Sequence, residues 1–212
     1  MNTANLLSFI HFGYFMKYDS GLSIDLSGVD KTQYSECTVE ELSARGLELY
    51  RKAVQDSFDS GRQQVLPLSG GLDSRAILAL LLECTEAENI RTYTYGTPGT
   101  LDYDIGCSLA KKAGTNHVKF PLTKHTYTEK ELVGASERTD HQVVLFMQPP
   151  LQQLDVRFSG AAVWSGFFGG RVSGSYKLYK ESPSLAEAKD AYLKRNRYVK
   201  TIPFPIDHKA LI

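Results

Sequence analysis

Residues 64 to 82 read QVLPLSGGLDSRAILALLL, an apolar run, a glycine-rich turn and then an almost wholly aliphatic segment. This order predicts a short strand over Gln64–Leu68, a loop over Ser69–Ser74 and a helix over Arg75–Leu82, because a helix packed against a sheet is apolar around much of its surface. Pro67 conflicts with the strand, since proline cannot donate the N–H that a neighbouring strand would accept. We expect it at a position where that N–H is not needed.

The strand, turn and helix recur further along the chain. Arg91–Tyr95 alternates like a strand, residues 96–99 form a turn, and apolar residues at helical spacing then continue to Gly114. Two more strands are predicted over His117–Phe120 and Ala161–Trp164. More helices are predicted after the capping boxes Thr38/Glu41 and Thr128/Glu131, after Pro149-Pro150, and from Ser184. Strands that alternate with helices indicate an α/β fold, a doubly wound parallel sheet flanked by helices, with ligands bound beyond the carboxyl ends of the strands.

Composition narrows the class of protein. The 212 residues contain 24 Lys+Arg and 24 Asp+Glu, so the chain lacks the positive field that would attract it to nucleic acid or an anionic membrane. The cysteines Cys37, Cys84 and Cys107 stand singly, which disfavours zinc and a disulfide framework and favours the cytoplasm. The apolar opening over residues 5–16 is too short to span a membrane and poor as a signal peptide. We therefore expect one cytoplasmic domain with neither nucleic acid nor membrane as a partner.

The Ser69–Ser74 loop has the composition of a phosphate-binding turn. Gly70 and Gly71 allow positive φ, so that several backbone N–H groups can converge on an anion. Ser69 and Ser74 offer hydroxyl donors, and the following helix contributes the positive end of its dipole. An ordinary turn between a strand and a helix has a similar composition. The complete S-G-G-L-D-S sequence, between a strand and an aliphatic helix, favours a nucleotide-type loop.

Asp73 is unusual in such a loop, because its carboxylate would repel phosphate. It is explained if it binds Mg²⁺ that bridges a polyphosphate, or if it caps the following helix, and the sequence is consistent with both. No lysine follows the glycines as in a Walker-A loop, and there is no G-x-G-x-x-G turn. Kinase, GTPase and dinucleotide-dependent chemistry are therefore disfavoured.

The hexapeptide resembles the pyrophosphate loop of the N-type ATP pyrophosphatases, which include asparagine synthetase, β-lactam synthetase, GMP synthetase and NAD synthetase. In these enzymes ATP is cleaved to AMP and pyrophosphate while a carboxyl or carbonyl oxygen is adenylated. The resemblance implies an adenine nucleotide alpha hydrolase-like fold, ATP and Mg²⁺ as cofactors, and Asp73 as a metal ligand. It also implies nucleotide contacts from Ser69, Gly70, Gly71, Leu72, Asp73 and Ser74.

Two further motifs are similar to those of asparagine synthetase in particular. Residues 96–102, GTPGTLD, and residues 114–117, GTNH, match a G-x-P-G-S-x-D turn followed at the same distance by G-T-x-H. The resemblance covers roughly residues 38–176. It implies that Tyr95 packs near the adenosine and that Asp102 opens the following helix, where a capping role is as consistent with the sequence as ligand contact. His117 is expected to be structural, and no catalytic residue is assigned.

The third shared element is residues 163–176, VWSGFFGGRVSGSY, which matches in frame the family's V-L-S-G-E-G-x-D-E-x-x-G-G-Y. Ser165 and Gly166 are retained, and the resemblance implies that they approach the AMP moiety.

Three acidic positions of this element are replaced, by Phe167, Gly170 and Arg171. Since Gly170 stands where the family has a metal ligand, Asp73 alone would anchor Mg²⁺ from the protein, and the affinity for Mg·ATP should fall. Arg171 is equally consistent with phosphate contact and with an exposed loop arginine.

The resemblance implies three regions and leaves two functions open. Residues 1–37 are expected to be the remnant of a linker to a missing glutaminase domain, 38–180 a synthetase domain, and 181–212 a helix and tail at a truncated C-terminus. One function is an ATP-dependent amidating ligase that adenylates a small carboxylate and takes ammonia from a glutaminase partner or elsewhere. The other is a degenerate homologue that binds nucleotide weakly or not at all and acts through a partner or a homodimer. A tRNA-modifying enzyme would require a basic face and often paired cysteines, which this chain lacks.

Overall fold

The computed structural model describes residues 12, 23, 25, 27–30, 32–138, 148–166 and 184–196. The chain divides into two units, one made of residues 25–126 and 149–169 and the other of residues 1–24, 127–148 and 170–212. The first unit contains the sheet and the Ser69–Ser74 loop. The second contains the helices α5 (Glu129–Arg138) and α8 (Leu185–Asn196).

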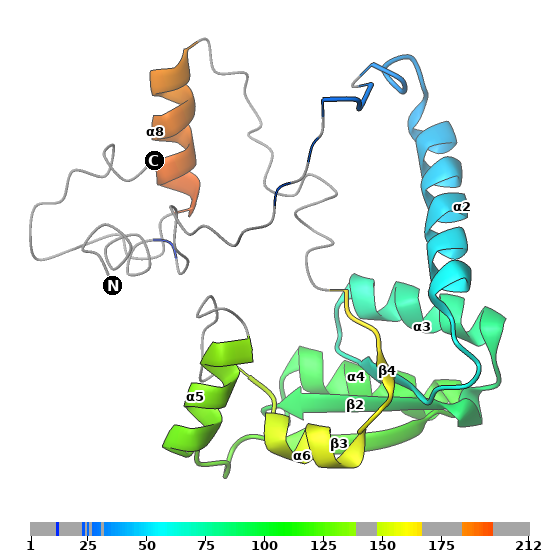
Figure 1. The fold of residues 1–212 in the computed structure, drawn as a ribbon, viewed down its shortest axis with the longest axis vertical. Helices are drawn as coiled ribbons and strands as arrows, with labels where there is room; N and C mark the ends of the chain where they lie inside the picture. The colour runs from blue at the N-terminus through cyan, green and yellow to red at the C-terminus, as the bar shows by residue number, and fades with distance from the viewer. Residues whose placement is uncertain are drawn as a thin grey trace, which may run out of the picture. The chain divides into compact units, whose positions relative to one another are not determined.

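A four-stranded parallel sheet organises the first unit. Its strands are β1 (Gln64–Pro67), β2 (Ile90–Gly96), β3 (Asn116–Pro121) and β4 (Ala162–Val163). They are ordered β3-β2-β1-β4 across the sheet, and all three neighbouring pairs are parallel (Figure 1). The chain thus moves outward from β1 to β3 and returns to the opposite side of β1 with β4. This arrangement confirms the predicted doubly wound α/β fold.

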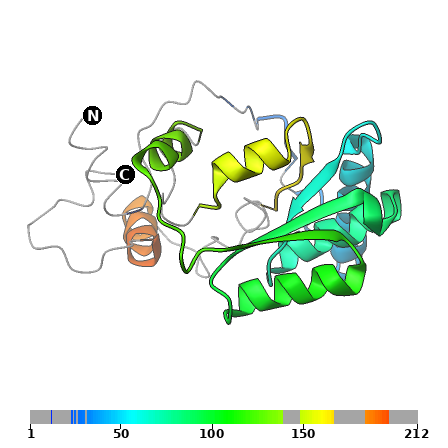
Figure 2. The same cartoon turned by 90° about the horizontal axis from the view of Figure 1, so that it is seen from below.

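The helices α3 (Leu72–Cys84) and α4 (Leu101–Ala113) cross from β1 to β2 and from β2 to β3, and they cover one face of the sheet (Figure 2). Successive strand residues point to opposite faces of the sheet. Leu66 of β1, and Leu68 directly after the strand, therefore face these helices. They form the larger core cluster with Val54, Ile77, Leu78, Leu80, Leu81, Ile90 and Ala110. The nearly all-aliphatic sequence of α3 is explained by this burial.

The helix α6 (Leu151–Arg157) lies over the opposite face (Figure 2). Val65 faces this side and packs with Tyr93, Phe120 and Phe158, while Leu154 of α6 lies against the cluster. The rings of Tyr93 and Phe158 stack with their centroids 5.8 Å apart. The sheet is therefore covered on both faces, as a parallel sheet requires.

Pro67 ends the pairing between β1 and β4. The N–H of Trp164 donates to the carbonyl of Val65 at 2.8 Å. In a regular parallel ladder the next bond would run from residue 67 to the carbonyl of Trp164, and proline has no N–H to donate. On its other side β1 continues, since the N–H of Leu68 donates to Tyr93 at 2.8 Å. Pro67 thus lies where pairing stops, as expected.

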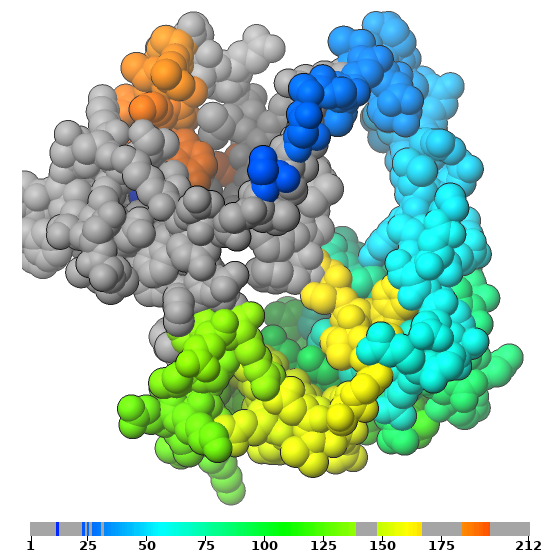
Figure 3. Space-filling model, viewed as in Figure 1, coloured from blue at the N-terminus to red at the C-terminus, as the bar shows by residue number. Residues whose placement is uncertain are grey.

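The helix α2 (Val39–Ser57) precedes β1 and begins with the predicted capping box. The Glu41 N–H donates to the Thr38 hydroxyl at 3.2 Å, and the Thr38 N–H donates to the Glu41 carboxylate at 2.8 Å. Arg51 forms a salt bridge of 2.6 Å with Glu83 of α3. Much of the helix surface remains exposed, as the space-filling view also shows (Figure 3).

In the second unit, the predicted capping box Thr128/Glu131 forms, and the helix predicted from Ser184 begins with a similar serine cap. The Glu131 N–H donates to the Thr128 hydroxyl at 3.2 Å before α5, and the Glu187 N–H donates to the Ser184 hydroxyl at 3.3 Å before α8. None of the helices in the described ranges combines the length and the apolar character that a membrane span needs.

Candidate functional site

The Ser69–Ser74 loop lies at the carboxyl end of β1, where the strand order reverses. The next crossover carries the chain to β2 on one side of β1, whereas β4 lies on the other side. In open α/β sheets the loops at such a reversal diverge and leave a crevice in which ligands bind. The predicted loop therefore occupies the position that this fold uses for ligands.

Gly166, which follows β4, lies directly against the loop. A Cβ atom on Gly166 would be 2.6 Å from the Cβ of Asp73, so only glycine permits this approach. Ser165, beside it, is exposed. The structure thus brings Ser165 and Gly166 to the Ser69–Ser74 loop, although the two segments are far apart in the sequence.

The two serine hydroxyls hold the loop in shape. The Ser69 N–H donates to the Ser74 hydroxyl at 3.2 Å, and the Gly71 N–H donates to the Ser69 hydroxyl at 3.1 Å. Ser74 is only 9% exposed. Both hydroxyls are therefore engaged inside the loop, which fixes the direction of its backbone.

The expectation of positive φ in the loop is wrong. Gly71 has φ −70°, and the described glycines with positive φ are Gly96, Gly99, Gly114 and Gly160. Gly70 is favoured for a different reason, because a Cβ there would make tight contacts, 3.0 Å from the carbonyl oxygen of Leu101 and 3.2 Å from the Cα of Asp102. Close packing against α4 is the constraint.

The helix α3 begins at Leu72, three residues earlier than predicted, so Asp73 and Ser74 belong to its first turn. The backbone amides of this first turn have no carbonyl of the helix to bond, and they lie at the positive end of its dipole. Gly71 occupies the N-cap and no side chain caps the helix, so the capping interpretation of Asp73 is wrong. The Asp73 side chain is exposed beside these amides.

Tyr95 lies near the end of β2, on the strand next to β1. Its ring centroid is 6.3 Å from that of Tyr93, and 36% of the residue is exposed. Burial raises the pKa of Tyr95 and raises the pKa of Tyr93 to about 12, so both phenols are neutral at physiological pH. Tyr95 can offer a ring face or a hydroxyl donor at the carboxyl edge of the sheet, but not a base.

Tyr50 of α2 is a neighbour of the loop that the sequence did not reveal. Burial, and then the negative charge of Asp73, raise the pKa of the Tyr50 phenol. The ring therefore lies within electrostatic reach of the carboxylate predicted to hold metal. Nothing in the spacing of α2 distinguishes Tyr50 from its other apolar positions.

Gly106 and Thr94 support the loop from beneath. The Thr94 hydroxyl, fully enclosed, donates to the carbonyl of Leu68 at 2.6 Å. A Cβ on Gly106 would lie 2.6 Å from that same oxygen. A glycine inside a helix was the signal that could have predicted this contact.

The second shared motif anchors the end of α4 to the sheet. Gly114 ends the helix with φ 77°, as predicted. The Thr92 hydroxyl lies 2.8 Å from the Thr115 hydroxyl and 2.9 Å from Nδ1 of His117. Burial, and then the charge of Lys119, lower the pKa of His117. The arrangement suits a structural histidine.

The described residues contain no group of three or more histidine, cysteine or acidic side chains placed to hold a metal ion. Phe167, Gly170 and Arg171 lie outside the described residues, so their predicted effect on metal and phosphate binding stays a prediction.

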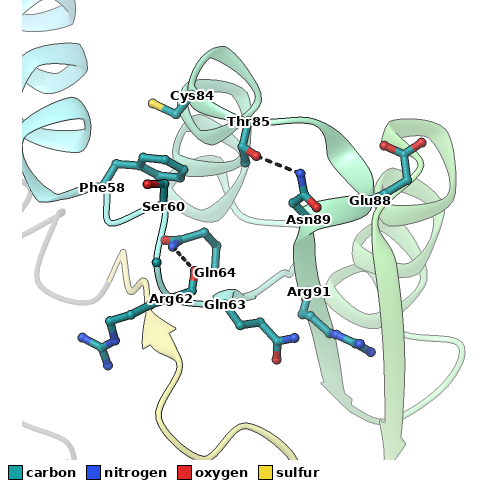
Figure 4. Close-up of a pocket in the computed structure, with 11 residues that line it drawn as sticks. Phe58, Ser60, Arg62, Gln63, Gln64, Cys84, Thr85, Glu88, Asn89 and Arg91 are labelled. Carbon is teal, nitrogen blue, oxygen red and sulfur yellow. Dashed lines mark hydrogen bonds between the residues drawn. The ribbon is translucent and has the colours of Figure 1, made fainter.

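A pocket of about 600 Å³ opens at the opposite edge of the sheet, near the amino ends of β1 and β2 (Figure 4). It lies between the turn that follows α2 and the segment joining α3 to the short 3₁₀ helix η1 (Ala87–Asn89). The guanidinium of Arg62 donates to the carbonyls of Gly160 and Ala161 at 3.0 and 2.6 Å. This pocket is walled in part by groups with structural partners and lies away from the Ser69–Ser74 loop.

The sequence matches the family model for asparagine synthase over residues 46–157, more than half of the chain. This range includes β1, the Ser69–Ser74 loop, β2 and β3. The chain belongs to the asparagine synthase family, whose members are ATP-dependent amidating ligases.

One relative is a probable glutamine-hydrolysing asparagine synthetase of Acanthamoeba polyphaga mimivirus, 25% identical over 193 residues. The match covers 86% of this chain and 34% of that protein. The chain therefore spans about a third of the length of this relative.

Proposed function

We propose that this protein binds ATP at the carboxyl edge of the sheet, over the Ser69–Ser74 loop and the segment after β4, and adenylates a small carboxylate there, with release of pyrophosphate. The approach of Gly166 to Asp73 supports this most directly, since it joins the two predicted nucleotide segments at the fold's ligand-binding position. Helix amides at a glycine-rich turn are suited to an anion.

In the proposed reaction a carboxylate oxygen of the acceptor attacks the α-phosphorus of ATP. A new P–O bond forms, and the bond from that phosphorus to the oxygen bridging to the β-phosphate breaks, so the electron pair leaves on pyrophosphate. The first-turn amides of α3, from Leu72 to Ser74, would hold the departing pyrophosphate oxygens. Ammonia then displaces AMP from the acyl adenylate.

Asp73 fits the role of a Mg²⁺ ligand, because its carboxylate is exposed at the loop, beside Gly166, and caps no helix. The cation would neutralise phosphate charge that this carboxylate otherwise repels. A glutaminase partner in the cytoplasm is proposed as the ammonia source.

Isothermal titration of the full chain with Mg·ATP tests binding, and a pyrophosphate-release assay with ammonium and a panel of small carboxylates tests adenylation. We expect binding at millimolar concentration or below and release with at least one carboxylate. An absence of binding at millimolar Mg·ATP would eliminate the proposal.

A degenerate homologue that acts through a partner or a homodimer is the second candidate, favoured by the non-acidic residues Phe167, Gly170 and Arg171. It predicts no pyrophosphate release with any carboxylate. Release that disappears in Asp73→Ala would exclude it.

A further inference from the structure

The turns after β1 and β2 place the same dipeptide at the same point of the following helix. Leu72 and Asp73 are the first two residues of α3, and Leu101 and Asp102 are the first two of α4. Both leucines are exposed, by 75% and 79%. Since β1 and β2 are parallel neighbours, both aspartates belong to the carboxyl edge of the sheet.

Asp102 contacts the Ser69–Ser74 loop directly. Its carbonyl oxygen accepts the N–H of Gly70 at 3.0 Å. A Cβ on Gly70 would lie 3.3 Å from the Oδ1 atom of the Asp102 carboxylate, so this carboxylate lies over the first glycine of the loop.

The place of that carboxylate in the first turn of α4 is favourable for the helix dipole, but among the described residues it has no partner. The N-cap of α4 is Thr100, no side chain caps the helix, and the N–H of Gly99 donates to Asp104 at 3.1 Å. Within the described ranges no hydrogen bond or ion pair engages the Asp102 carboxylate, and the residue is exposed. The capping role considered from the sequence is therefore not observed.

Two carboxylates beside one phosphate-binding loop would oppose a bare triphosphate. Arg75 folds back onto the loop, where its Nε donates to the carbonyl of Gly71 at 3.1 Å, and its single positive charge balances at most one of the two carboxylates. Magnesium bound with nucleotides commonly takes one or two protein carboxylates, with phosphates and water completing its octahedron. A cation shared by these carboxylates and the triphosphate would remove the repulsion.

We propose that Asp102 is a second protein ligand, direct or through one water, of the divalent cation that accompanies the nucleotide at this loop. The inference rests on the proposed function. It gives this chain a second candidate carboxylate ligand, although Gly170 has replaced the acidic residue of the family pattern in the sequence.

The test is an electron paramagnetic resonance titration of Mn²⁺ into the full chain with α,β-methylene-ATP, which cannot be cleaved to pyrophosphate. We expect Asp102→Asn to weaken Mn²⁺ binding roughly tenfold. Asp104→Asn is the matched control, because it removes one charge from the same helix turn and keeps an oxygen for Gly99. It should change Mn²⁺ binding by less than about twofold. Asp102→Ser serves as a second variant.

Binding of the same nucleotide in EDTA separates the ligand role from a structural one. Asp102→Asn should bind the metal-free nucleotide more tightly than the native chain, because one repelling charge is gone. Damage to the loop would instead weaken binding of the nucleotide both with and without metal. Unchanged Mn²⁺ affinity, or parallel weakening with and without metal, would overturn the role of Asp102 alone. If the native chain binds the nucleotide neither with Mn²⁺ nor in EDTA, the proposed function is overturned together with the role of Asp102.

Discussion

At the scale of single residues, glycines control the geometry of the candidate site through contact rather than through backbone conformation. Gly166 approaches Asp73 at a distance that a side chain would not permit, and Gly70 approaches Asp102 at distances that a Cβ atom would make tight. The sequence predicts that the loop needs glycine, but not why. Positive φ depends on the backbone of a single residue, whereas the approach of α4, or of the segment after β4, depends on the tertiary fold.

Gly166→Ala should weaken Mg·ATP binding. The added methyl would lie 2.6 Å from the Cβ of Asp73, so the chain after β4 must move away from the loop. Relief of such an overlap costs about 1–3 kcal/mol, and if that cost falls on the ATP-binding conformation the affinity drops by about 5-fold to 150-fold. Isothermal titration measures the affinity for Mg·ATP. Gly46→Ala is the control, because a Cβ at Gly46 meets nothing within 4 Å. Equal affinities of the two variants for Mg·ATP would contradict the proposed site.

His117 should make the folding free energy depend on pH. Its pKa is lowered in the folded state, by burial and then by Lys119, so the unfolded chain binds the proton more readily. The stabilisation is present above the unfolded pKa of about 6.5 and is lost as the pH falls toward the folded value. Urea titrations between pH 5 and 8 should show this loss, and it should be smaller in His117→Gln. An identical pH profile for the two proteins would count against the assignment.

At the scale of elements, the sequence predicted the order and type of every described strand and helix that it addressed. Hydrophobic period and capping boxes are local signals, and Thr38/Glu41 and Thr128/Glu131 both form as predicted. The start of α3 was missed by three residues because Leu72-Asp73-Ser74 carries loop-type polarity although it is the first helical turn. Tyr50 could not be assigned to the loop, since its position depends on how α2 packs against α3.

Gly106→Ala should destabilise the protein even though alanine is the better helix former. The added methyl would meet the Leu68 carbonyl at 2.6 Å and the Thr94 hydroxyl at 2.8 Å, deep beneath the loop. We expect a loss of about 1–3 kcal/mol in the free energy of unfolding from the overlap. Gly46→Ala, also inside a helix but without neighbours, should gain about 0.5–1 kcal/mol. Urea denaturation compares the two, and a gain in both would show that α4 packs less closely than described.

At the scale of the whole molecule, nucleotide binding should appear as increased stability. A ligand that binds the folded chain only, at 100 times its dissociation constant, adds about 2.7 kcal/mol to the free energy of unfolding. Thermal unfolding with Mg·ATP should therefore shift upward in the native chain, and much less in Asp73→Asn. A shift of equal size in Asp73→Asn would place the nucleotide elsewhere.

The positions of β1 and β4 along the chain also set when the candidate site can be completed during synthesis. Asp73 and Gly166 are separated by 166 − 73 = 93 residues, although they touch in the folded protein. Ribosomes add about 5–20 residues per second, so the Ser69–Ser74 loop emerges about 5 to 20 s before the glycine that closes against it. Within that interval β1, β2 and β3 can pair while one edge of β1 has no neighbour. The nascent chain consequently carries an open strand edge until β4 arrives, and this edge is where a chaperone or a mispaired strand would bind.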